Sequence, residues 1–76
     1  MRMVLLNQVI TAVRQLDIWS TIDLRVNSYK TIRNSRWDNI ELCQYAYYPV
    51  RYFDFAYNSL TKSYNVYIEL NERLGE

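Results

Sequence analysis

The sequence contains no histidine and only one cysteine, one proline and one glycine. Without histidine, and with Cys43 as the single thiol, the usual nitrogen and sulfur ligands of a zinc site are missing. There is no glycine-rich loop to hold a phosphate group, and neither histidine nor paired carboxylates indicate acid–base catalysis. We therefore expect a protein that is not an enzyme and that has neither a metal site nor a cofactor.

A strong charge of one sign is also missing, since nine basic and eight acidic residues give a net charge of +1. Such a balance argues against electrostatic binding to duplex nucleic acid or to an anionic membrane. The first apolar run, Met3 to Leu6, ends at Asn7 and Gln8. It is too short for an export signal or a membrane span. With one cysteine and no export signal, we expect a cytoplasmic protein without membrane contact.

The chain is nevertheless apolar enough to fold. Half of its 76 residues are hydrophobic, which is too many for an intrinsically disordered chain. A chain of this length suits one small hydrophobic core, so residues 1–76 are expected to form a single domain.

Apolar residues recur at three- and four-residue spacing near the N-terminus. Leu6, Val9, Ile10, Val13 and Leu16 would share one side of a helix. The spacing predicts an amphipathic helix over residues 3–17, packed against one face of a sheet.

Further along the chain, apolar and polar residues alternate, as in half-buried strands. This pattern predicts strands over residues 20–27, 51–57 and 64–70. We expect an α+β fold in which the N-terminal helix covers one face of an antiparallel sheet of about four strands. The expected sheet side of the core is Ile22, Leu24, Val26, Ile40, Leu42, Phe53, Phe55, Val66, Ile68 and Leu70.

Residues 36–48 fit two patterns. As a strand, favoured by the β propensity of tyrosine and isoleucine, the segment would supply the fourth strand and end at the turn around Pro49. As a helix, it would begin after Ser35, and the sheet would have three strands. We prefer the strand.

Aromatic residues gather in one stretch, Tyr45 to Tyr57, where seven of the thirteen positions are aromatic. Under the four-strand interpretation, Phe53 and Phe55 point into the core and several tyrosines point to the uncovered face. Tyrosine offers a large contact area with little entropy to lose, so it is enriched at protein interfaces. The predicted partner-binding residues are Tyr45, Tyr47, Tyr52, Tyr67 and Arg25.

The eight residues Arg51 to Asn58, RYFDFAYN, resemble in part the aromatic octapeptide of RNA-recognition-motif domains. Arg51, Phe53 and Phe55 match in type and spacing. Asp54, however, occupies the place of a small residue and brings a negative charge. The roles of that motif are therefore not transferred to this chain.

The sequence predicts a small, non-catalytic protein-binding module that acts stoichiometrically through a tyrosine-rich sheet face. One example of such a module is an inhibitor of a host defence or transcription protein, encoded by a phage or a mobile element. The first alternative is a protein that binds single-stranded nucleic acid by aromatic stacking and arginine contacts. The second is a homo-oligomeric structural protein.

Overall fold

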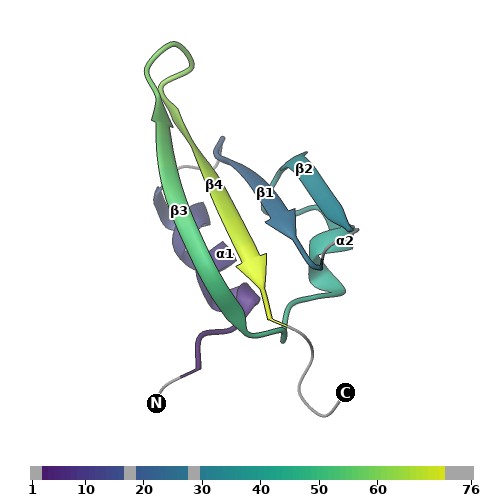
Figure 1. Cartoon of the computed structure of the whole chain (residues 1–76). Helices are drawn as coiled ribbons and strands as arrows, with labels where there is room; N and C mark the ends of the chain where they lie inside the picture. Colours follow the sequence, from purple (N-terminus) through teal and green to yellow (C-terminus); the bar gives the residue numbers. More distant parts are fainter. Residues whose placement is uncertain (1–2, 17–18, 28–29, 72–76) are drawn as a thin grey trace.

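The computed structural model describes residues 3–16, 19–27 and 30–71. Its elements, in chain order, are α1 (Leu6–Leu16), β1 (Thr21–Arg25), β2 (Thr31–Ser35), α2 (Ile40–Cys43), β3 (Val50–Asn58) and β4 (Ser63–Leu70). The four strands form one sheet, and α1 packs on one of its faces (Figure 1). The predicted α+β fold with about four strands is confirmed.

A side-chain cap sets the start of α1. The Leu5 backbone N–H, which has no partner within the helix, donates to Oε1 of Gln8 at 2.8 Å. A glutamine three positions into a helix that reaches back in this way stabilises the first turn. The apolar stripe of α1 then places Leu6, Val9 and Val13 in the core.

Residues 3–5 lie outside the helix, although the sequence predicts a helix over residues 3–17. Leu5 forms a bridge with Pro49, and the Val50 N–H donates to the Val4 carbonyl at 2.8 Å. These contacts attach the N-terminal segment to the start of β3, so the helix begins later than predicted. The last residue of the predicted range lies outside the described residues.

The sheet consists of two antiparallel hairpins that meet in parallel. The strand order is β2-β1-β4-β3, with β1/β2 and β3/β4 antiparallel and β1/β4 parallel. Ile22 lies beside Val66 and Leu24 beside Ile68 in the central pair. The sheet is therefore mixed, where the sequence had suggested antiparallel pairing throughout.

The core lies between the helices and one face of the sheet, and its strand residues come mainly from β1 and β4. Its buried hydrophobic residues are Leu6, Val9, Val13, Ile22, Leu24, Val26, Ile32, Leu42, Val66, Ile68 and Leu70. A helix is roughly 10 Å across and neighbouring strands lie about 4.8 Å apart, so a single helix covers about two strands. In this fold the buried residues of the sheet lie mainly on β1 and β4, at its centre, with Ile32 of β2 and Leu42 of α2 in the same core.

Three residues that were expected in the core are exposed, and this part of the prediction was wrong. Phe53 is 47% exposed and Phe55 37%, although they lie opposite the buried Ile68 and Val66 and so share the face that α1 covers. Strand β3 is at the edge of the sheet and, within the described residues, is flanked by β4 alone, so fewer side chains pack against these rings. Ile40, the first residue of α2, is 79% exposed.

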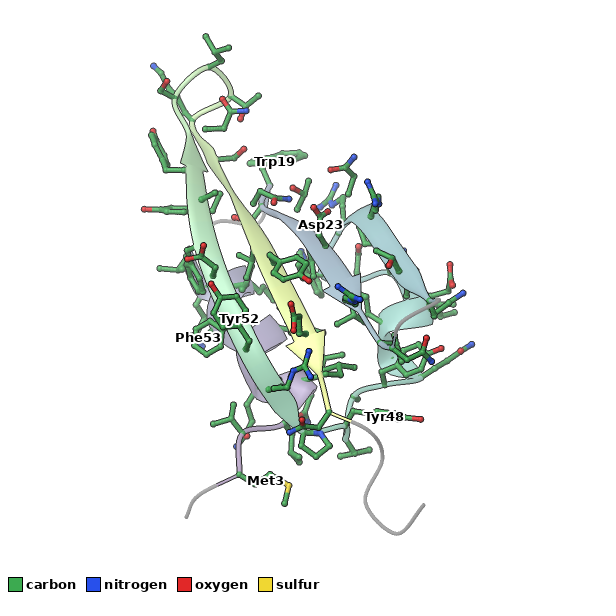
Figure 2. The ribbon with its side chains drawn as sticks, viewed as in Figure 1. Met3, Trp19, Asp23, Tyr48, Tyr52 and Phe53 are labelled. Atoms are coloured by element: carbon green, nitrogen blue, oxygen red, sulfur yellow. The ribbon has the colours of Figure 1, made fainter. Side chains whose placement is uncertain are left out.

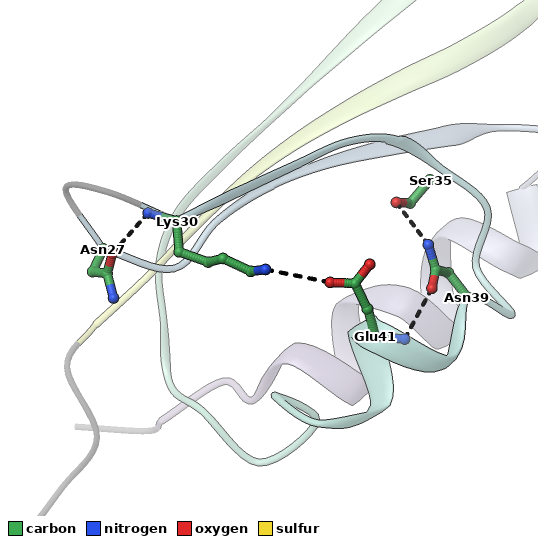
Figure 3. Close-up of polar contacts among 5 residues, drawn as sticks. All are labelled: Asn27, Lys30, Ser35, Asn39 and Glu41. Carbon is green, nitrogen blue, oxygen red and sulfur yellow. Dashed lines mark hydrogen bonds and ion pairs between the residues drawn. The ribbon is translucent and has the colours of Figure 1, made fainter.

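The prediction of a strand over residues 36–48 was also wrong. The helical alternative is present in shorter form, as α2, and the fourth strand is β2. Asn39 caps α2: its Oδ1 accepts from the Glu41 N–H at 2.9 Å, and its Nδ2 donates to Oγ of Ser35 at 3.0 Å (Figure 3). Lys30, just before β2, forms an ion pair with Glu41 at 3.4 Å. These contacts attach the short helix to β2.

Because side chains on the central strand β1 are more buried than those on the edge strand β3, substitutions on the two strands should differ in their effect on the free energy of unfolding. Leu24→Ala removes a fully buried side chain and should lower the free energy of unfolding by about 2–5 kcal/mol. Phe53→Ala should cost less, because Phe53 is already 47% exposed. Urea unfolding of both variants measures the difference. Equal losses would mean that β3 is as well covered as β1.

Candidate functional site

The candidate site is the sheet face opposite α1, which we call the open face. Val66 and Ile68 of β4 are buried under α1, so the residues that alternate with them point to the other side. The strand registers add their neighbours on β1 and β3. The open face comprises Thr21, Asp23, Arg25, Tyr52, Asp54, Ala56, Asn65, Tyr67 and Glu69.

Glu69 is at the centre of a hydrogen-bonded group on this face. The Tyr67 hydroxyl donates to its Oε2 at 2.7 Å, and Nη2 of Arg51 donates to its Oε1 at 2.5 Å. Arg51 reaches the open face beside a register shift between Val50 and Tyr52, where the alternation of β3 is interrupted. Both carboxylate oxygens are thus engaged.

An aromatic pair and a second arginine adjoin this group. The rings of Tyr52 and Tyr67 lie 6.3 Å apart at an angle of 60°, and Tyr52 is 51% exposed. Arg25 is exposed and lies beside Glu69 in the pairing of β1 with β4. The structure therefore brings together three of the five predicted binding residues, Arg25, Tyr52 and Tyr67.

The other two predicted residues are not on the sheet. Tyr45 and Tyr47 lie between α2 and β3, because their segment forms a helix and turns instead of a strand. The Tyr45 ring packs edge-on against Tyr48 at 5.2 Å and against the core, whereas Tyr47 is exposed. Figure 2 shows that Tyr48 lies at one end of the sheet, away from Tyr52. The predicted tyrosine face is thus divided.

Asp23 has a structural contact on the open face. Its Oδ1 accepts the Asn34 backbone N–H at 2.8 Å, next to the register shift between β1 and β2 (Figure 2 shows Asp23 on β1). Asn34 has a φ of 52°, in the left-handed region that asparagine tolerates better than most residues. Asp23 therefore holds β2 in place.

Sequence reasoning missed two features of this side of the molecule. Arg51 was not expected at the site, because a regular strand would have turned it away from Glu69. The exposure of Phe53, Phe55 and Tyr57 was also missed. Alternation indicates which residues share a face, but it does not show whether a helix covers their strand.

Comparisons with protein-family models, curated proteins and solved structures find no match to this chain. The described residues contain no group of three or more acidic or cysteine side chains placed to hold a metal ion. Within the same residues, no helix is long and apolar enough to cross a membrane. The site is therefore interpreted from its own geometry.

The contacts of Glu69 shift two pKa values in opposite directions. The hydrogen bond from Arg51, followed by that from Tyr67, lowers the pKa of Glu69 below its usual 4.5. The hydrogen bond to Glu69, followed by burial, raises the pKa of Tyr67 above its usual 10.0. The folded state thus favours an ionised carboxylate beside a neutral phenol.

A pH dependence of stability follows from the lowered pKa of Glu69. Its contribution is present above the pKa of the unfolded chain and is lost as the pH falls through the lower, folded value. Glu69→Gln should therefore be less stable than the wild type at neutral pH and should lose less stability below pH 4.5. Urea unfolding over a pH series measures this.

Glu41→Gln is the matched control, because the Lys30–Glu41 ion pair is about half exposed and such pairs contribute little. This variant should follow the wild type in acid. An unchanged acid response of Glu69→Gln would contradict the assigned role of Glu69.

Proposed function

We propose that this protein is a non-catalytic protein-binding module that acts stoichiometrically through the open face of its sheet. The observation that carries the proposal is the exposed Tyr52 ring beside Tyr67 and Arg25, on a face that α1 does not cover. Tyrosine and arginine are the residue types in which binding energy at protein interfaces is concentrated.

The fixed position of the rings supports the proposal. The hydroxyl of Tyr67 is held by Glu69, and Glu69 is held in turn by Arg51. The ring of Tyr67 then adjoins that of Tyr52. Side chains ordered before binding lose less conformational entropy when a partner arrives. A preformed aromatic surface suits recognition of a folded protein.

The charges on the open face favour a protein over a nucleic acid. Asp23, Asp54 and Glu69 share the face with Arg25, and Arg51 is already paired with Glu69. Carboxylates among the aromatic rings would repel phosphate groups, whereas a protein surface can match charges of both signs. Binding of single-stranded nucleic acid and a role as a phage-encoded inhibitor both stay predictions.

The double variant Arg25→Ala/Tyr52→Ala tests the proposal. Both side chains are exposed, so circular dichroism should show a folded protein. Affinity capture from a bacterial lysate, read by mass spectrometry, identifies a candidate partner, which is then purified. A titration with that partner should show binding at least about 30-fold weaker than that of the wild type, as expected for loss of a strong interface contact.

Tyr47→Ala is the matched control, since it removes an exposed tyrosine outside the sheet. It should bind the partner as the wild type does. Equal affinity of the double variant and the wild type would exclude the open face as the binding site. Tight, salt-sensitive binding of a fluorescent single-stranded oligonucleotide, lost in the double variant, would instead favour the nucleic-acid alternative.

A further inference from the structure

Strand β3 has a long free edge. It is the last strand in the order β2-β1-β4-β3, and its nine residues contain neither glycine nor proline. The described residues before α1 pair with the beginning of β3, through the Val50–Val4 hydrogen bond. Within the described residues, no other strand pairs with the outer side of Arg51 to Asn58 (Figure 1). Such an edge is a template for pairing with another chain.

One hydrogen bond shows which backbone groups point outward. The Phe55 N–H donates to Oδ1 of Asp54, a side chain of its own strand, at 3.0 Å. In an antiparallel ladder, alternate residues turn their N–H and C=O groups toward the neighbouring strand. Phe53, Phe55 and Tyr57 therefore present these groups to the free edge.

The side chains of the same residues form an exposed aromatic stripe on the α1 side of β3. Phe53 and Phe55 have ring centroids 5.8 Å apart, and Tyr64 of β4 contacts both Phe55, at 6.4 Å, and Tyr57, at 5.2 Å. Tyr57 is 58% exposed. Unpaired backbone groups and exposed rings thus lie along one edge of the sheet.

We propose that two copies of this chain associate through β3, antiparallel to each other about a two-fold axis at Phe55. The two sheets would then join into one, with the aromatic stripes of both copies side by side. A two-fold axis lets one patch serve both subunits, provided that the patch is complementary to itself. This proposal does not rest on the proposed function, because it uses the edge of the sheet and not its open face.

The position of Asp54 on β3 favours pairing with a second copy of the chain, and it favours one register of that pairing. Two β3 strands can pair their outward backbone N–H and C=O groups near the middle of the free edge in two registers. One places Asp54 opposite Asp54 of the second copy, where like charges would repel. The other places Phe55 opposite Phe55, Phe53 opposite Tyr57, and Asp54 opposite the uncharged Ala56. In this second register the surface is complementary to itself.

The Asp54–Phe55 hydrogen bond has a place in this association. In the single chain, the carboxylate occupies the central N–H of the free edge. In the pair, the Phe55 N–H would donate to the carbonyl of Phe55 in the second copy instead. The Phe55 N–H therefore has a hydrogen-bond acceptor both in the single chain and in the pair.

A charge-reversal experiment tests the register directly. Phe55→Lys and Phe55→Asp each place two like charges opposite each other at the axis, so each variant alone should dissociate at least about 30-fold more readily than the wild type. Mixed in equal amounts, the two variants place opposite charges there and should form a heterodimer. Sedimentation velocity over a concentration series measures all four samples: the wild type, each variant and the mixture.

Ile40→Lys is the control, since it puts a charge on an exposed apolar residue of α2, and it should dimerise as the wild type does. If either change at Phe55 prevents folding, Tyr57→Asp, at a more exposed position of the stripe, should weaken association in the same direction. A wild type that is monomeric throughout, variants that dimerise as well as the wild type, or a mixture that stays monomeric would each overturn the proposal.

Discussion

The parallel contact between β1 and β4 is the constraint on which the other elements depend. Each strand belongs to a hairpin, and each brings a fully buried aliphatic pair, Ile22 and Leu24 from β1 and Val66 and Ile68 from β4. Full burial of one such side chain contributes about 1.5–3 kcal/mol, so joining the two hairpins at these strands brings a large part of the hydrophobic core together. The strands β2 and β3 are then left at the two edges.

The exposed surfaces follow from that arrangement. Because β3 is an edge strand, Phe53 and Phe55 stay partly exposed although they lie on the same side of the sheet as α1. The open face has no covering element among the described residues, and there the Tyr67–Glu69–Arg51 contacts order the rings. The proposed partner site and the proposed self-association edge are therefore separate surfaces. If two copies join through β3, their open faces become continuous.

Local patterns in the sequence predicted the helices and strands better than they predicted which strands lie side by side. The stripe containing Leu6 and Val13 predicted α1, and the alternation in β1 and β4 predicted the correct faces. The position of Phe53 at an edge could not be predicted, because alternation carries no information about strand order. Near α2, the cap formed by Asn39 and its bond to Ser35 outweigh the β propensity of the tyrosines. Arg51 reaches the site only because β3 is irregular there.

The central claim is that the two hairpins meet through parallel pairing of β1 with β4. Nuclear Overhauser contacts between the backbones of these strands test it most directly, because the direction of pairing fixes which residues meet. The account predicts contacts of Ile22 with Val66 and of Leu24 with Ile68. Contacts of Ile22 with Ile68 and of Leu24 with Val66 would indicate antiparallel pairing and would contradict the account.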